Sequence, residues 1–421
     1  MNEFDQIIGY ESEKKVLMQL ADVLKNTAKY KAKGVELPGG LLLHSNPGTG
    51  KSLMAKCLMK ASGRSQFIFC KSDSDDNAIE ELKQAYKEAS EATPSILLLE
   101  DLHLYGPQPY SPIYPTIQSL IDESRIKGID IFFIGTVNSI NTIPESLLRP
   151  LRFDYNIKLS NPDMETAEKI IRYYLKGRKL ASDASSKDLV KALHGGSCAT
   201  LESVMNVATL NSVYYGHSAI TKSDIIEGIL QIVHSLHLDN SALTPEELEQ
   251  VAYHEAAGHA LVSEILRPGN VSMITLASSM DGRIGMTDYA NSTGYSTCEE
   301  ILNRATTDLA GKAAVDVFYG RSDVGVKEDI QLAMEHIRMA VSWLASSGFT
   351  ALDYENRNIS EERNTHIEKL VSAKMEELYQ KAKQIIKENE ATAVALQKAL
   401  LKQKTLLSSD IQHIMRETSK R

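Results

Sequence analysis

The chain has 421 residues, which is enough for two or three domains with buried cores. Its formal net charge of -9 argues against a nucleic-acid-binding surface as the main function, and we expect no nucleic-acid partner. The four cysteines are scattered, and no stretch approaches about 18 consecutive apolar residues, so we expect a cytoplasmic protein with no transmembrane segment in this chain.

Residues 1–36 have the pattern of a short leading segment followed by an amphipathic helix. Within the leading segment, the glycine at position 9 allows a tight turn. We therefore expect Ile8 and Gly9 to lie against the base of a bound nucleotide.

Residues 39–52, with the sequence GGLLLHSNPGTGKS, predict a strand, a glycine-rich loop and the start of a helix. In such a loop the backbone N–H groups surround the phosphates of ATP, a lysine contacts the β- and γ-phosphate oxygens, and a serine hydroxyl ligates Mg²⁺. The usual pattern begins with glycine, where this chain has Ser45. The residues that we expect to hold ATP and Mg²⁺ are Asn46, Pro47, Gly48, Thr49, Gly50, Lys51 and Ser52.

The sequence SILLLEDLH, residues 95–103, predicts a buried parallel strand that delivers two carboxylates beside this loop. ATPases of this type have Asp, which holds the metal, followed by Glu, which polarises the attacking water. In this chain the order is reversed, so Glu100 would hold the metal and the shorter Asp101 would act on the water. The shorter side chain predicts slow hydrolysis, since a misplacement of about 1 Å can cost about 10²-fold in rate. In an alternative register Asp101 holds the metal and Leu102 replaces the base, which abolishes hydrolysis. The sequence leaves both registers open.

Two further patterns complete the predicted ATPase site. The strand pattern IDIFFIGTVNS ends at Asn138, which we expect to hydrogen-bond the attacking water or the γ-phosphate. Arg149 and Arg152, in LLRPLRFD, lie where arginines reach the phosphates of a neighbouring subunit rather than their own. The alternative for both arginines is a surface salt bridge.

The order of these motifs, FDQIIG, GLLLHSNPGTGKS, ILLLED, IGTVN and LLRPLRFD, resembles the AAA ATPase module in its FtsH-type subfamily. The resemblance continues through VAYHEAAGHALVSEIL and VKEDIQLAMEHI to the last helix. It implies a homo-oligomeric, hexameric ring that hydrolyses ATP and degrades unfolded proteins at a zinc centre. It also implies an α/β AAA core with a parallel sheet over residues 1–159, a helical lid over 160–235, a linker over 236–248 and a mainly α-helical zinc-protease domain over 249–421.

The histidine motif departs from its usual spacing. Zinc proteases use H-E-x-x-H on one helix face, whereas this chain has HEAAGH, one residue longer. At about 100° per residue, His254 and His259 differ by about 140°, so a regular α-helix does not direct both at one ion. Three outcomes are open. In the first, a π-bulge at residues 256–258 places both histidines on the same side of the helix, and Glu255 is the general base. In the second, Glu255 and His259 chelate the metal and the general base is lost; in the third, the helix is purely structural.

By the resemblance, the third zinc ligand is an Asp that opens a later helix, and Asp329 matches that position. The alternative is an ordinary acidic residue at a helix start. The choice of zinc also rests on the resemblance, because nitrogen and oxygen ligands suit other transition metals as well. In the family an edge strand pairs with the substrate backbone, and residues 284–287 are our candidate for it, with an ordinary hairpin as the alternative.

The segment after Cys70, KSDSDDN, lacks the aromatic residue of the family's first pore loop. Substrate threading is then weak, or it uses three tyrosines of a Pro-rich loop, Tyr105, Tyr110 and Tyr114. The alternative is that these tyrosines face a partner protein or are half-buried. Together with the reversed acids and the longer histidine motif, this leaves a second function open. The chain is then a non-proteolytic, nucleotide-dependent scaffold or remodeller with weak or no ATP hydrolysis.

Overall fold

The computed structural model describes residues 3–70, 77–105, 111–238, 243–279, 282, 284–290, 296–321, 326–348 and 361–419. The chain divides into two compact units. Unit 1 contains Met1–Gly177 and Gly195–Ser203, and unit 2 contains Arg178–His194 and Val204–Arg421. Unit 2 therefore includes much of the segment that the sequence analysis assigned to the lid.

Unit 1 is built around a five-stranded parallel sheet with the order β2-β3-β4-β1-β5. The three central strands are apolar and almost wholly buried, as expected for a parallel sheet that helices cover on both faces. This confirms the predicted α/β core. The strands are β1 (Gly40–His44), β2 (Ser65–Phe69), β3 (Ser95–Leu99), β4 (Ile131–Val137) and β5 (Tyr155–Lys158).

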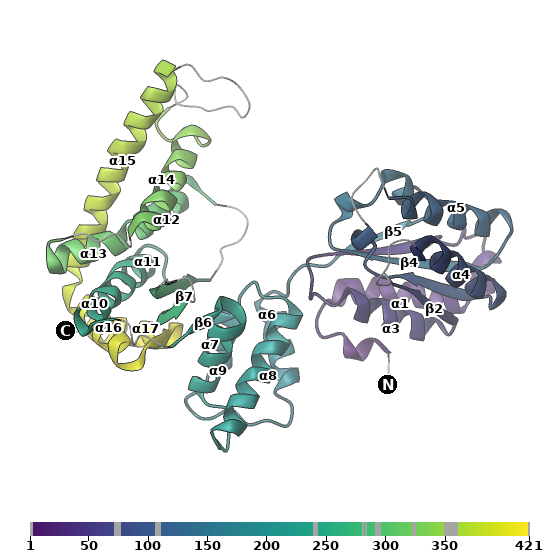
Figure 1. The fold of residues 1–421 in the computed structure, drawn as a ribbon, viewed down its shortest axis with the longest axis horizontal. Helices are drawn as coiled ribbons and strands as arrows, with labels where there is room; N and C mark the ends of the chain where they lie inside the picture. Colours follow the sequence, from purple (N-terminus) through teal and green to yellow (C-terminus); the bar gives the residue numbers. More distant parts are fainter. Residues whose placement is uncertain are drawn as a thin grey trace. The chain divides into compact units, whose positions relative to one another are not determined.

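The helices α1 and α3 cover one face of this sheet, and α4 and α5 cover the other (Figure 1). Leu41 and Leu43 belong to the core beneath α1 and α3, whereas Leu42 belongs to the core beneath α4 and α5, because successive strand residues face opposite sides. The helices and short turns of unit 1 are η1 (Glu3–Gln6), α1 (Glu11–Lys25), α2 (Thr27–Lys31), α3 (Lys51–Ser62), α4 (Ala78–Glu91), η3 (Leu102–Tyr105), α5 (Ile113–Ile126), η4 (Ile140–Thr142), η5 (Glu145–Leu148), α6 (Met164–Tyr174) and the first turns of α8 (Cys198–Tyr214).

The described residues of unit 2 are mainly helical and include a small sheet, in which β7 pairs antiparallel with β6, β8 and β9. Its strands are β6 (Leu236–His237), β7 (Val271–Ser279), β8 (Ile284–Tyr289) and β9 (Thr405–Leu407). Its helices are α7 (Ser186–Ala192), the rest of α8, α9 (Lys222–Ile229), η6 (Leu230–His234), α10 (Pro245–Ala252), η7 (Tyr253–Ala260), α11 (Leu261–Leu266), α12 (Cys298–Asp308), α13 (Ala310–Tyr319), α14 (Lys327–Ser342), α15 (Glu361–Glu388), α16 (Glu390–Gln403) and α17 (Ser408–Thr418).

The helical stretch from α10 to α11 runs through the core of unit 2, and its middle section, η7, is a π-helix. The residues of η7 that face the core are small, and Ala256 and Ala257 are fully buried. A Cβ on Gly258 would lie 2.6 Å from the carbonyl oxygen of Ala310, so only glycine lets α13 approach this closely. Small side chains thus bring η7 and α13 together.

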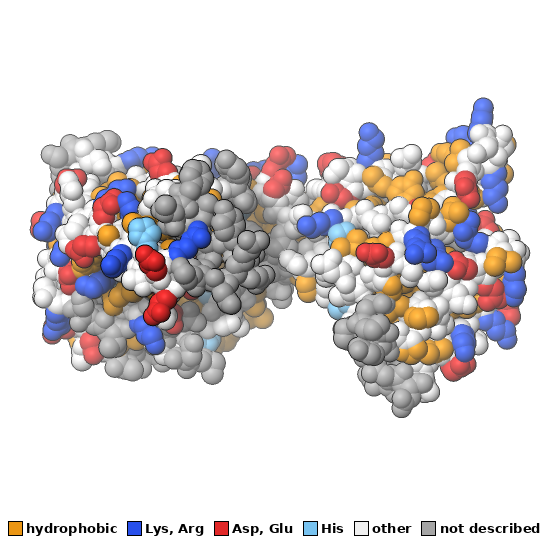
Figure 2. All heavy atoms as spheres, turned by 90° about the horizontal axis from the view of Figure 1, so that it is seen from above, with side chains coloured by type: hydrophobic (Ala, Val, Ile, Leu, Met, Phe, Trp, Pro, Cys, Tyr) orange, Lys and Arg blue, Asp and Glu red, His pale blue; other side chains and the backbone are white. Residues whose placement is uncertain are grey.

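Charged side chains are distributed over the surface of both units. On the face drawn in Figure 2, acidic and basic side chains are interspersed over the described surface of each unit. Such mixing is typical of a solvated protein surface.

Candidate functional site

The glycine-rich loop connects β1 to α3 in unit 1, as the sequence predicts. Gly48 and Gly50 have φ angles of 79° and 100°, which lie in the left-handed region. A Cβ on Gly48 would lie 2.6 Å from Ser197 Oγ, so the start of α8 packs directly against the loop. Asn46 and Pro47 are exposed at the loop, and Ser52 is the second residue of α3.

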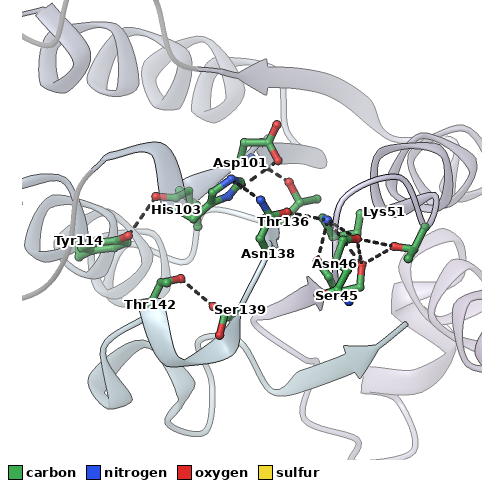
Figure 3. Close-up of polar contacts among 12 residues, drawn as sticks. Ser45, Asn46, Lys51, Asp101, His103, Tyr114, Thr136, Asn138, Ser139 and Thr142 are labelled. Atoms are coloured by element: carbon green, nitrogen blue, oxygen red, sulfur yellow. Dashed lines mark hydrogen bonds and ion pairs between the residues drawn. The ribbon is translucent and has the colours of Figure 1, made fainter. Parts of the chain in front are cut away.

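The side chains of the loop are bonded to one another. The hydroxyl of Ser45, the residue that departs from the pattern, forms a hydrogen bond with the hydroxyl of Thr49. Lys51 is 7% exposed, and its Nζ donates to Ser45 O and to Asn138 Oδ1, each at 3.0 Å (Figure 3). Burial lowers the pKa of Lys51, and the nearby charge of Asp101 opposes that change. The loop therefore holds a lysine ammonium where phosphate oxygens are expected.

The two acids follow β3 and occupy different surroundings. Glu100 Oε1 lies 3.8 Å from Lys56 Nζ of α3. Asp101 has a φ of 50°, and its N–H donates to Thr136 Oγ1 at 2.8 Å. Asp adopts this left-handed conformation more readily than Glu, so the backbone itself favours the shorter acid at this position. Leu102 is fully buried in the sheet core and offers no base in the alternative register.

Asn138 lies at the end of β4, and both ends of its amide are hydrogen-bonded. Its Oδ1 accepts from Lys51, and its Nδ2 donates to His103 Nε2 at 2.6 Å. His103 was not identified from the sequence. A titratable residue two positions after an acid pair, at the same end of a parallel sheet, is a signal that points to it.

The two arginines differ in their contacts. Arg149 is exposed. Arg152 makes a bidentate ion pair with Asp122 of α5, with its Nε and Nη2 at 3.0 and 2.8 Å from the carboxylate, and its Nη1 donates to Ser146 O. Within its own chain, Arg152 therefore makes the salt bridge that the sequence analysis left as an alternative.

The turn at Gly9 is present, with a φ of 73°. A Cβ there would lie 2.3 Å from Thr166 Cγ2 of α6, so the turn packs against that helix, with Ile8 partly exposed beside it. The next residue, Tyr10, donates its hydroxyl to Ser160 O at 2.8 Å and lies 3.4 Å from Cys198 Sγ. The N-terminal segment is thus fixed to the start of α8, next to the glycine-rich loop.

The second site is in unit 2, where the structure has the first of the three outcomes, a π-helix over Tyr253–Ala260. Its wider turn places residues five apart on one side. As a result, His254 Nε2 lies 3.0 Å from His259 Nε2. Asp329, at the start of α14, brings Oδ2 to 3.1 Å from His254 Nε2 and 3.4 Å from His259 Nε2.

These three ligand atoms fit a tetrahedral metal ion. Zinc–nitrogen bonds of about 2.0–2.1 Å in a tetrahedral arrangement separate the ligand atoms by about 3.3 Å, which matches the observed distances. Burial lowers the pKa of His259, but the bonds and charge of Asp329 outweigh it and raise the pKa to about 9. Burial raises the pKa of Asp329, and the two histidines more than reverse this and bring it well below its usual value. The site therefore concentrates negative charge where a cation would bind.

Neighbouring helices fix the two imidazoles. His259 Nδ1 donates to Thr307 O of α12 at 2.8 Å, which leaves Nε2 as the metal donor. A Cβ on Gly311 of α13 would lie 2.5 Å from His254 Nε2 and 2.7 Å from His259 Nε2. Position 311 must therefore be glycine for both rings to keep these positions. Neither Thr307 nor Gly311 was identified from the sequence.

Glu255, the candidate base, is 6% exposed and accepts a hydrogen bond from Thr287 Oγ1 at 2.7 Å. Its charge also acts on His259, so it lies close to the candidate metal ligands. Thr287 belongs to β8, which in the described part of the chain is the last strand of its sheet. The candidate base thus contacts the candidate substrate strand.

The proposed role of the tyrosines in threading is wrong for the two that the structure describes. Tyr105 is 9% exposed and stacks on Phe69, and Tyr114 is 1% exposed and donates its hydroxyl to Leu102 O. Both are core residues and do not face a substrate. Tyr110 and residues 71–76 of the predicted first pore loop lie outside the described residues.

Two family models match the chain: the ATPase family associated with various cellular activities (AAA) over residues 41–161, and peptidase family M41 over residues 241–414. The chain is 29% identical to the ATP-dependent zinc metalloprotease FtsH of Mycoplasma pneumoniae, in a match that covers 99% of this chain and 62% of the relative. It is 30% identical to the protein of the same name from Mesomycoplasma conjunctivae, over 85% of this chain and 50% of the relative. The chain thus spans 50–62% of the length of these relatives. Among the described residues, no helix has the length and apolar character needed to cross a membrane.

Proposed function

We propose a function from the premise that this chain belongs to the FtsH-type family of AAA ATP-dependent zinc metalloproteases. The chain hydrolyses ATP to deliver unfolded proteins to a zinc peptidase centre, and it does so in a homo-oligomeric, hexameric ring. Its functional parts are an ATPase core over residues 1–159, a lid over 160–235, a linker over 236–248 and a peptidase domain over 249–421.

The observation that carries the peptidase half is the π-helix of η7. It allows His254, His259 and Asp329 to hold zinc, which would supply a polarised water and a Lewis acid at an open fourth position. Glu255 accepts the proton of that water, and the hydroxyl of Thr287 orients its carboxylate. The strand β8 pairs with the backbone of an extended substrate, so cleavage tolerates many sequences.

The ATPase half rests on the loop between β1 and α3. Lys51 and Ser52 bind the phosphates and Mg²⁺, while Glu100 supports the metal and Asp101 accepts the proton of the attacking water. The exposed Arg149 reaches the nucleotide of a neighbouring subunit. Arg152 holds the segment that carries Arg149 against α5 through its ion pair with Asp122.

The scaffold remains a second candidate function, and one observation favours it. The two described tyrosines that were expected to grip a substrate are buried, so neither supplies the aromatic grip of a threading pore. A ring without that grip would bind proteins and release them uncut.

Metal content and proteolysis separate the two candidates. The peptidase predicts about one chelatable zinc per chain and ATP-dependent degradation of an unfolded casein-type substrate. Glu255→Gln is the matched control, because it removes the base and leaves the three zinc ligands in place. It should retain zinc and lose cleavage. A folded wild-type chain without zinc and without cleavage would contradict the peptidase and leave the scaffold.

A further inference from the structure

His103 has no assigned role in the ATPase motifs, yet it hydrogen-bonds to Asn138, one of the proposed ATPase residues. It lies in η3, directly after the acid pair, with its side chain 19% exposed. Its Nε2 is 2.6 Å from Asn138 Nδ2, and its Nδ1 is 4.0 Å from Asp101 Oδ1. Figure 3 shows the imidazole directed toward Asn138.

The bonding pattern fixes the orientation of the Asn138 amide. A lysine ammonium has only donors, so the atom of Asn138 that lies 3.0 Å from Lys51 Nζ must be the carbonyl oxygen. The amide nitrogen therefore faces His103, and Nε2 of His103 must accept its proton. In this arrangement the ring hydrogen of His103 is on Nδ1, which lies 4.0 Å from Asp101 Oδ1.

We propose that His103 is a positioning residue of the ATPase site, which holds Asn138 with its carbonyl oxygen toward the nucleotide. In this orientation Asn138 accepts hydrogen bonds from Lys51 and from the attacking water, and it does not donate to the γ-phosphate. This inference rests on the proposed ATPase function and gives a role to a residue for which the motif predicts none.

The orientation matters because of the shorter acid. A water molecule that attacks phosphorus has two hydrogens to place, and two acceptors fix its direction. Asp101 is one methylene shorter than the usual Glu, so on its own it holds the water less well. The carbonyl oxygen of Asn138 supplies the second acceptor. Without an acceptor at position 103 the amide rotates freely once Lys51 binds phosphate, and this second contact is lost.

The decisive comparison is between two variants of His103. His103→Phe keeps a planar ring of similar size and removes the acceptor, whereas His103→Gln places a carbonyl oxygen at a similar reach. Steady-state ATPase rates of the full chain with Mg²⁺ give kcat and KM for each variant. We expect His103→Phe to lower kcat by about 10- to 100-fold with KM within about threefold of wild type, and His103→Gln to recover most of the rate.

Structural damage gives a different result, because it lowers the thermal midpoint and nucleotide affinity of both variants together. Wild-type kcat in His103→Phe would overturn the inference, and so would equal losses of kcat in both variants. If His103→Phe does not fold, His103→Leu makes the same comparison with His103→Gln. A wild-type chain without ATPase activity overturns the proposed function and this inference together, whereas an active wild type with an unaffected His103→Phe overturns this inference alone.

Discussion

The two sites depart from their family patterns in opposite ways. In the glycine-rich loop and at the end of β3, the side chains at Ser45, Glu100 and Asp101 change while the backbone keeps the expected strand, loop and helix. In η7 the side chains stay the same and the backbone changes, because one extra residue is absorbed by a π-helix. A substitution can be compensated by a neighbouring side chain, whereas an insertion in a helix needs room in the packing around it.

That room comes from small residues. Ala256, Ala257 and Gly258 lie in the wider turn, and Gly311 of α13 faces both histidines. With larger side chains the π-helix would collide with α13. The comparison therefore predicts that metal binding at the proposed zinc centre is sensitive to side-chain volume, and that the proposed nucleotide site is sensitive to the loss of hydrogen-bonding groups.

The largest effect is expected for Gly311→Val. Its Cβ would lie within 2.7 Å of both Nε2 atoms, so we expect zinc content to fall from about one per chain to near zero. Gly320→Ala, at the C-terminal cap of the same helix, is the control, because position 320 has open space around it and a φ of 64°. It should cost about 1 kcal/mol of stability and leave zinc bound. Metal analysis after gel filtration measures both, and a zinc-replete Gly311→Val protein would contradict the packing argument.

The second effect separates the two arginines. Arg149→Ala should lower the ATPase rate by about 10³-fold with little change in stability, since an arginine finger acts only on the transition state. Arg152→Ala should instead lower the free energy of unfolding by about 1–3 kcal/mol, because it leaves Asp122 and Ser146 O without their partner. ATPase rates and urea denaturation distinguish them. Equal loss of stability in both variants would show that Arg149 is structural.

A smaller effect is expected when the usual acid is restored. Asp101→Glu adds the missing methylene, and we expect the ATPase rate to rise by about tenfold. The gain is limited because Glu fits the left-handed conformation at position 101 less well, at a cost of about 1 kcal/mol in stability. Glu100→Asp, which shortens the other acid, is the control and should not raise the rate. A slower Asp101→Glu enzyme would mean that the site is built around the shorter side chain.

The smallest effect is expected for removal of the extra residue. Deleting Ala257 restores the usual motif length, and the π-helix becomes a regular α-helix with both histidines still on one side. Zinc content should therefore stay near one per chain. A second alanine inserted after Ala257 is the opposite change, and it should abolish zinc binding. If the deletion variant loses zinc, zinc binding requires the π-helical geometry itself, and a regular α-helix of the usual motif length cannot replace it.

Much of the fold follows from local patterns in the chain. The glycine-rich loop, the buried strands and the helix that begins at Lys327 are visible in the sequence, since each depends on the periodicity and turn residues of a short segment. The π-helix was one of three open outcomes, because it depends on whether neighbouring helices leave space. The space depends on Gly311, which is more than fifty residues from His254 and His259 in the sequence.

The contacts that were missed are all made between distant segments. His103 and Asn138 meet only because β3 and β4 are neighbours in the sheet. Arg152 pairs with Asp122, and Tyr114 is buried against Leu102. Both contacts result from tertiary packing that no local sequence pattern predicts. The strand β9, between α16 and α17, was missed for the same reason, since its three residues form a strand by pairing with β7.

The central claim is that one cation is shared by two histidines five positions apart and a distant aspartate. X-ray absorption at the zinc edge, on the full chain and on His259→Ala, tests it most directly. The account predicts one zinc with two imidazole nitrogens at about 2.0–2.1 Å in the wild type, and loss of that zinc in the variant. A wild-type protein that binds no zinc, or a His259→Ala protein whose zinc keeps two imidazole ligands, would contradict it.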